Sequence, residues 1–166
     1  MMLRTLVLAA AAALSLLASA DAAFAQVVEG EEHCVVNVAS ADALNLRERP
    51  SASSRIWTTL PYGRCGIIVT EACRGSWCPV EDGHHSGWVN SRYISMVSPA
   101  LYCVSNVAAG DRLNMRAFPS GNSRILTSLA RNQCGVAFLP YATGSWQKVR
   151  VGGFEGWVNR RYLSGQ

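Results

Sequence analysis

The sequence contains no apolar run of the roughly 20 residues that a membrane-spanning helix needs. Its most apolar segment, residues 6–18, is shorter than that. Beyond residue 25 it has no helical periodicity, no glycine-rich phosphate loop and no dinucleotide fingerprint. These absences argue against a protein stably inserted in a membrane, a helical fold and a nucleotide-dependent enzyme.

The first residues have the pattern of a cleavable export signal. Arg4 precedes the apolar run at 6–18, and an Ala-x-Ala sequence follows at 23–25. We therefore predict a signal peptide over residues 1–25, with cleavage at its end. No cysteine that could accept a lipid follows until Cys34. The mature protein is expected to be secreted or periplasmic.

A repeat of 69 residues organises the mature chain. Residues 34–97 align without a gap on residues 103–166, and 30 of the 64 pairs are identical. Each unit is long enough to fold alone if it is covalently stapled. The Ser-Pro-Ala segment at 98–100 favours two independent units, which we place at residues 33–97 and 101–166.

Short alternating runs broken by turn residues predict an all-β fold. Arg-Gly at 74–75 and Thr-Gly at 143–144 predict hairpin turns, in which glycine supplies positive φ. We expect a meander in which consecutive strands are neighbours. In the first repeat the expected strands are 35–39, 44–47, 56–60, 65–72, 76–81, 87–89 and 93–95, and the second repeat follows at the same offset.

Several motifs recur in the same order in both repeats. LNLRERPS at 44–51 and LNMRAFPS at 113–120 are each followed by Gly-Ser-Trp and then by Gly-Trp-Val-Asn-x-Arg-Tyr. This pattern resembles the bacterial SH3-like domain, often written SH3b, over nearly the whole mature chain. The resemblance implies two tandem small SH3-like β barrels. It also implies an extracytoplasmic targeting or ligand-binding module, since many members hold cell-wall hydrolases on peptidoglycan.

The sequence departs from the family pattern at one position. The family commonly has glycine before the motif proline, whereas this chain has Arg49 and Phe118 there. A residue before proline is pushed towards extended geometry, which a side chain tolerates. The fold prediction is unaffected, but the shape of the adjacent loop is not given by the resemblance.

Six cysteines in a short exported chain indicate a disulfide framework. Two pairs are equivalent in the two repeats and enclose loops of equal length, which argues for one bridge inside each repeat. A third pair occurs only in the first repeat and flanks its Gly-Ser-Trp hairpin. The predicted bridges are Cys34–Cys65, Cys73–Cys78 and Cys103–Cys134.

The polar residues of the motif strand are candidates for ligand binding. They alternate with apolar residues and so point away from the core, either as a solvated face bonded to the adjacent loop or as a groove for a peptide or glycan. Four tryptophans at equivalent positions are interpreted first as core, although a partly exposed indole edge could line a groove. The candidate ligand-binding residues are Asn45, Arg47, Trp77, Trp88, Asn114, Arg116, Trp146 and Trp157.

Metal and catalytic interpretations have less support. Cys73, Cys78, His84 and His85 do not have the usual spacing of zinc ligands, and adjacent histidines on a strand point to opposite faces. We therefore predict no metal and no cofactor. A thiol nucleophile is disfavoured because bridges consume the cysteines, so we expect no enzyme activity.

Charge separates the two repeats. The second repeat has seven arginines and one lysine against two acidic residues, whereas the first has six arginines against five acidic residues. An anionic polymer or a membrane surface is a reasonable partner for the basic repeat, and a merely solubilising charge is the alternative. The leading hypothesis is a non-catalytic module that binds peptidoglycan or another envelope polymer. The alternative is an adaptor that holds a secreted protein by strand addition; nucleic acid is not expected.

Overall fold

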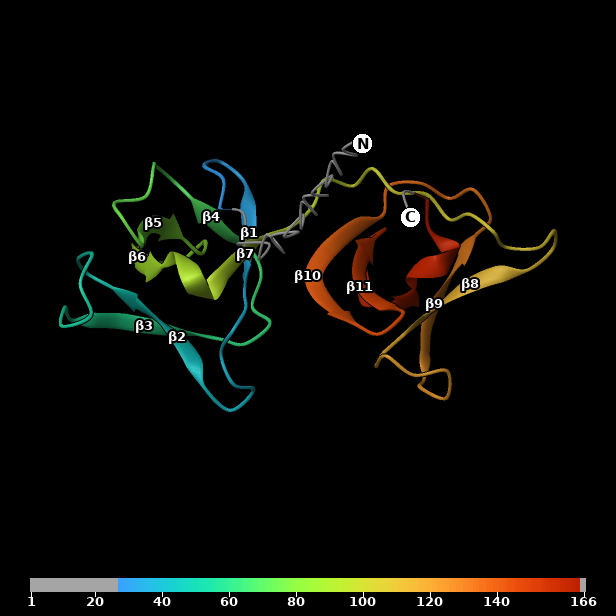
Figure 1. The fold of residues 1–166 in the computed structure, drawn as a ribbon, viewed down its shortest axis with the longest axis horizontal. Coiled ribbons are helices and arrows are strands. Elements are labelled where there is room, and N and C mark those ends of the chain that lie inside the picture. The colour runs from blue at the N-terminus through green and yellow to red at the C-terminus, as the bar shows by residue number, and fades with distance from the viewer. Residues whose placement is uncertain (1–26, 165–166) are drawn as a thin grey trace, which may run out of the picture.

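The computed structural model describes residues 27–164, and the predicted signal peptide lies outside the described residues. Within that range the chain is all-β, with a seven-stranded sheet in the first repeat and a five-stranded sheet in the second (Figure 1). Neither of the two 3-10 turns within residues 27–164 has the length or hydropathy of a membrane span. The predicted all-β fold class is confirmed.

The two repeats contribute the following elements. The first contains β1 (Glu32–Val35), β2 (Ala43–Arg47), β3 (Ile56–Pro61), β4 (Ile67–Val69), β5 (Trp77–Glu81), β6 (Ser86–Asn90), the 3-10 turn η1 (Ser91–Tyr93) and β7 (Ile94–Met96). The second contains β8 (Arg112–Arg116), β9 (Ile125–Ala130), β10 (Ala137–Thr143), β11 (Trp146–Val151), β12 (Phe154–Asn159) and η2 (Arg160–Tyr162).

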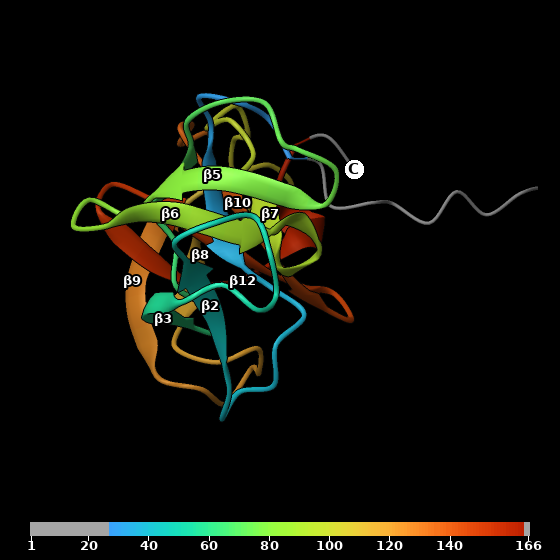
Figure 2. The same cartoon turned by 90° about the vertical axis from the view of Figure 1, so that its left-hand side faces the viewer.

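The strand order differs from the predicted meander. It is β3-β2-β6-β5-β4-β1-β7 in the first repeat and β10-β11-β12-β8-β9 in the second. The meander prediction holds for β2-β3, β4-β5-β6, β8-β9 and β10-β11-β12 and is wrong elsewhere: β3 does not pair with β4, β9 does not pair with β10, and β1 lies between β4 and β7. A curved sheet that encloses one core brings strands that are distant in the sequence together, including its first and last strands. Figure 2 shows the curvature: β5 and β6 run across the direction of β2.

The first strand also begins earlier than predicted. It spans Glu32–Val35 and ends before Asn37, whose φ of 58° turns the chain out of extended geometry. Asparagine tolerates this left-handed conformation better than most residues. The hairpin predictions are confirmed, since Gly75 and Gly144 have φ of 60° and 53° between paired strands.

Each repeat has its own aliphatic core. β2 alternates buried and half-buried residues, so that Leu46 is fully buried, and Met115 has the same place in β8. Two glycines allow the sheet to fold over this core. A Cβ at Gly87 would lie 2.6 Å from the Arg47 carbonyl oxygen, and one at Gly156 would lie 2.6 Å from Met115 Cγ. The glycine of each Gly-Trp-Val motif is therefore a close-approach position.

The repeats, each with its own core, also pack against each other. A third apolar cluster spans the junction and comprises Cys34, Val36, Val97, Ala137, Leu139 and Tyr141. Tyr141 Oη donates a 2.7 Å hydrogen bond to the Val35 carbonyl across it. The Ser-Pro-Ala segment is part of the contact, because Ser98 N–H donates to the Phe138 carbonyl at 2.9 Å and Ser98 Oγ accepts from Phe138 N–H at 2.7 Å.

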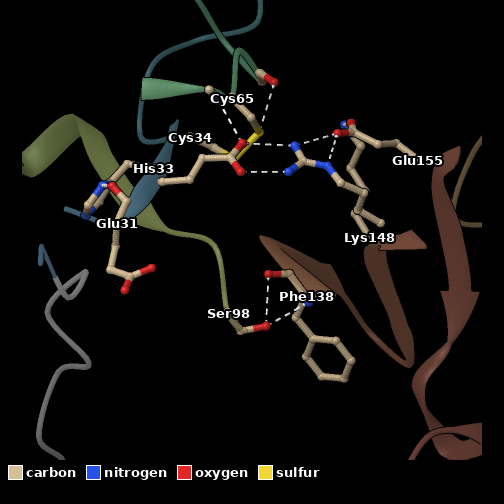
Figure 3. A network of polar contacts seen from close by, with 12 residues as sticks. Glu31, His33, Cys34, Cys65, Ser98, Phe138, Lys148 and Glu155 are labelled. Atoms are coloured by element: carbon tan, nitrogen blue, oxygen red, sulfur yellow. Dashed lines mark hydrogen bonds and ion pairs between the residues drawn. A yellow bond between two sulfur atoms is a disulfide. The ribbon is translucent and has the colours of Figure 1, made fainter. Parts of the chain in front are cut away.

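A network of charged side chains connects the two repeats at the junction (Figure 3). Arg150 of β11 donates to both oxygens of Glu32 in β1, at 2.7 and 3.0 Å, and its Nε donates to Glu155 at 2.8 Å. We call this contact between Arg150 and Glu32 the latch. The hydrogen bonds from Arg150 hold the pKa of Glu32 below its usual value, and they raise that of Arg150.

The sheet edges fall into two classes. β7 and β10, which are edge strands of their sheets, approach each other at the junction, whereas β3 and β9 are the edges away from it. β3 and β9 are equivalent strands of the two repeats, and both carry exposed apolar residues, namely Ile56, Trp57 and Ile125.

Candidate functional site

Each repeat contains one groove beside its motif strand. The first groove has a volume of about 460 Å³ and the second of about 500 Å³. The first is lined by Asn37, Val38, Ala39, Asp42, Ala43, Leu44, Asn45, Arg47, Ala52, Trp77, Asn90 and Tyr93. The second is lined by Asn106, Val107, Ala108, Asp111, Arg112, Leu113, Asn114, Arg116, Gly121, Trp146, Asn159 and Tyr162.

The two linings are equivalent residue by residue. Every one of the twelve positions in the second groove lies 69 residues after a position in the first. Ten of the twelve pairs are identical, whereas fewer than half of all pairs in the repeat are. The groove surface is therefore duplicated more faithfully than the domain that carries it.

Local structure explains how the walls form. On β2 the residues between the buried leucines face outwards, which places Asn45 and Arg47 along the groove. The opposite wall comes from the start of β5 and from η1, where Trp77 and Tyr93 lie. Asn90 Oδ1 accepts from Arg92 N–H at 3.1 Å and so caps η1, as Asn159 does for η2.

The motif arginines have a structural task within the groove. Arg47 Nη1 donates to the Ser54 carbonyl, and Arg116 Nη1 donates to the Ser123 carbonyl, each at 2.7 Å. Both bonds hold the loop that contains the motif proline. A guanidinium has five N–H groups, so one bond leaves donors that a ligand can use. Structural and binding roles are compatible at these positions.

The tryptophans divide into two pairs. Trp77 and Trp146 line the grooves, whereas Trp88 and Trp157 do not. All four are half-buried and none belongs to the buried clusters, which are formed by smaller side chains, so the interpretation as core is wrong. The Arg74 guanidinium lies over the Trp88 ring at 5.0 Å, and Trp157 packs against the junction cluster.

The two grooves differ in charge. Arg112 stands in the second groove where Ala43 stands in the first, and the remaining difference is Gly121 for Ala52. Arg112 Nη2 donates to the Ser128 carbonyl at 2.8 Å. In residues 27–164 no arginine of either groove forms an ion pair with a carboxylate. The second groove is therefore the more basic surface.

Several groove residues were not among the sequence candidates. Asn37, Asp42, Asn90 and Tyr93 join the predicted residues of the first groove, and their counterparts join the second. Asp42 Oδ1 accepts from Ala43 N–H at 2.7 Å and shapes the loop that forms one end of the groove. The sequence could have indicated these four residues, because each has an identical residue 69 positions later.

The disulfide prediction is confirmed. The three bridges are Cys34–Cys65, Cys73–Cys78 and Cys103–Cys134, and no cysteine of the described chain is free. Between residues 27 and 164 no three histidine, cysteine, aspartate or glutamate side chains are grouped as metal ligands. Asp82 Oδ1 accepts from the backbone N–H groups of His84 and His85, at 3.0 and 2.8 Å. These hydrogen bonds shape the turn in which the two histidines lie.

Comparison with known proteins agrees with the duplicated architecture. The family model of the bacterial SH3 domain matches residues 42–95 and again residues 111–164. No curated protein matches the chain. The solved structures of NlpC2 and NlpC1 from Trichomonas vaginalis are similar at 14% identity, with TM-scores of 0.39 and 0.38 and coverage of 82% and 93% of this chain. The chain corresponds to about half of each of them, 48% and 51%. The two family-model matches, 42–95 and 111–164, cover most of the folded repeats. The chain therefore belongs to the bacterial SH3 domain family.

Proposed function

We propose that the protein is a non-catalytic extracytoplasmic binding module whose two grooves recognise peptidoglycan or another envelope polymer. The duplicated groove carries this proposal, because ten identical lining residues survive in repeats that differ at most other positions. Bacterial SH3 domains are commonly cell-wall binding modules. Three disulfides are typical of proteins in an oxidising compartment, which fits a secreted or periplasmic location.

The chemistry of the grooves suits a polymer with amide and hydroxyl groups. Asparagine and arginine supply hydrogen-bond donors and acceptors, while Trp77 and Tyr93 supply apolar surface beside them. The additional arginine of the second groove adds an attraction for anionic groups that salt weakens. Binding is therefore expected to have a part that depends on the shape of the groove and a part that depends on salt.

Sedimentation with purified sacculi tests the proposal. We compare the parent with Asn114→Ala/Arg116→Ala in the second groove and with Arg160→Ala/Arg161→Ala on the exposed turn after β12. The groove variant should be retained less at both 0.1 M and 1 M salt, by about threefold to tenfold for the hydrogen bonds removed. The turn variant should differ from the parent only at low salt, where the Debye length is about 10 Å.

Folding must be checked in the same preparations. Because Arg116 holds the loop at Ser123, its removal could act on stability, so Asn114→Ala alone serves as the variant that leaves this bond intact. A parent that does not sediment with sacculi contradicts the proposal. Retention of all variants at the parent level would remove the grooves as the binding site.

The adaptor function is supported by one separate observation. β3 and β9 are the outer edge strands of their sheets, and each pairs with a neighbour on one side only. The exposed residues Ile56, Trp57 and Ile125 lie along them. Such edges can accept a strand from a partner. Trp57→Lys should abolish co-purification with a secreted partner under this function and leave sedimentation with sacculi unchanged.

A further inference from the structure

A third hollow, of about 360 Å³, lies at the junction of the two repeats, and we call it the junction cleft. The first repeat contributes Asn37 and Tyr62, and the second contributes Pro119, Tyr141 and Trp157. Unlike the grooves, the junction cleft occurs once. The positions equivalent to Tyr62 and Tyr141 in the other repeat are an arginine and an alanine.

The lining of the junction cleft is aromatic and uncharged. Tyr62, which is 45% exposed, and the half-buried Trp157 present ring surface to the cleft, whereas Tyr141 is 7% exposed and its ring is largely covered. The rings of Tyr62 and Tyr141 meet edge to face with centroids 5.5 Å apart. No charged side chain is among the described residues that line it. Lys148 Nζ lies 5.2 Å from the centroid of the Tyr141 ring but is not part of the lining. Sugar rings present C–H faces that pack on aromatic rings.

The cleft is held in a defined shape by the junction. The Tyr141 hydroxyl is bonded to the Val35 carbonyl of the other repeat, and the latch between Arg150 and Glu32 ties β11 to β1. Gln147 Nε2 donates to the Tyr141 carbonyl at 3.1 Å, which fixes the backbone behind the ring. A site whose walls are fixed in advance loses less entropy when it binds.

The junction cleft shares a residue with the first groove and borders on a turn that also lines the second. Asn37 lines both the first groove and the cleft. At the other end Pro119, in the cleft, and Gly121, in the second groove, belong to the same turn between β8 and β9. The junction cleft therefore adjoins the first groove at Asn37 and lies two residues along the chain from the second groove at Pro119.

We propose that the junction cleft is a binding site for neutral sugar rings that joins the two grooves end to end, so that one extended glycan strand occupies both repeats. The inference rests on the proposed function and assigns the glycan part of the polymer to a site of its own. It makes the pair of repeats, and not the single repeat, the unit of recognition.

The test uses peptide-free glycan strands, released from sacculi by an amidase and sorted by length, titrated into the full chain by calorimetry. The affinity of the parent should keep rising with strand length beyond the length that one groove can hold. Tyr62→Arg introduces the residue that the second repeat has at this position, Arg131, and should lower the affinity for long strands about tenfold while short strands bind as to the parent.

Two matched controls separate the cleft from general effects. Arg131→Tyr makes the reciprocal change outside the cleft and should leave the length dependence intact. Trp157→Phe trims a ring of the cleft, whereas Trp88→Phe makes the same change at the equivalent position of the first repeat, outside the cleft. Only the first of these two should reduce binding of long strands. Thermal unfolding verifies that each variant is folded.

The outcomes distinguish this inference from the proposed function. If the parent sediments with sacculi and Tyr62→Arg binds strands of every length like the parent, the junction cleft is not a binding site and the grooves stand alone. If the parent binds wall peptides but no peptide-free strands, the assignment to sugar is wrong. If strands bind with the predicted dependence on Tyr62 while intact sacculi do not sediment the protein, the cleft is supported and wall attachment is contradicted.

Discussion

The two repeats hold the same hairpin together by different chemistry. In the first, a disulfide joins Cys73 to Cys78 across the turn. In the second, Gln147 takes the place of Cys78, and its buried Nε2 donates to the carbonyls of Leu139 and Tyr141 at 2.7 and 3.1 Å. A covalent bond in one repeat and a buried amide in the other thus tie the equivalent hairpin.

A second difference concerns the start of each repeat. His33 is fully buried in β1, where Nε2 accepts from Val28 N–H at 3.1 Å and Nδ1–H donates to the Glu31 carbonyl at 2.8 Å. The equivalent residue of the second repeat is Tyr102, which stacks on Phe138 at 3.8 Å between ring centroids. The first repeat thus fixes the chain that precedes it, whereas the second packs an aromatic pair.

The largest expected effect comes from the duplicated disulfides. Both close loops with a sequence separation of 31, so Cys34→Ala/Cys65→Ala and Cys103→Ala/Cys134→Ala should each cost about 3–4 kcal/mol of unfolding free energy. The first pair should cost more, because Cys34 is buried in the junction cluster. Denaturant unfolding measures both, and equal losses would mean that the junction does not depend on this side chain.

The next effect concerns the hairpin tie. Gln147→Ala leaves two buried carbonyls without their donor and should cost about 1–3 kcal/mol. Ala142→Cys/Gln147→Cys copies the arrangement of the first repeat and should recover most of that loss when oxidised. Peptide mapping confirms the new bridge, and thermal unfolding of the oxidised and reduced forms compares the two ties. No recovery on oxidation would show that the two hairpins are not interchangeable.

A smaller effect is expected from the latch. Since both side chains are about a third exposed, a double-mutant cycle of Glu32→Gln and Arg150→Gln should give a coupling of about 1 kcal/mol. The pKa of Glu32 lies below its usual 4.5, so this stabilisation is present above about pH 4.5 and is lost as the pH falls through the folded-state value. Glu155→Gln is the control, because it keeps the contact across the junction. A coupling near zero at pH 7 would contradict the latch.

The smallest effect is specific to the first repeat. Burial lowers the pKa of His33 from 6.5, so on acidification the unfolded chain takes up a proton before the folded one does. Stability should therefore decline as the pH falls below about 6.5, by no more than about 1.4 kcal/mol per pH unit. His33→Gln removes the titrating group and should flatten that part of the profile. A profile identical to that of the parent would assign the decline to other groups.

The sequence predicted the fold and two of the three disulfides because these are encoded twice, whereas the third bridge, Cys73–Cys78, was predicted from its position across one hairpin. The 69-residue repeat and its motifs gave the domain family, and equal cysteine spacing gave the two duplicated bridges. Six of the eight candidate binding residues line the grooves, since alternation on β2 places Asn45 and Arg47 on its outer face. Binding by these residues is still a prediction.

The junction could not be predicted in this way. Glu32, Tyr62 and Arg150 have no counterpart of the same type in the other repeat, so comparing the repeats gives no signal for them. The short segment at 98–100 indicated separate units, because a proline after a strand commonly ends its pairing. Pairing of Ser98 with Phe138 depends on where the second repeat lies, which local patterns do not encode.

Pairing of the two repeats also bears on aggregation. An unpaired edge strand offers free N–H and C=O groups to other chains, and natural sheets avoid or cover such edges. Here β7 and β10 approach each other, so each repeat shields an edge of its neighbour. A repeat expressed alone would expose that edge together with the apolar residues of the junction cluster. Each repeat produced alone should therefore be more prone to self-association than the chain that contains both.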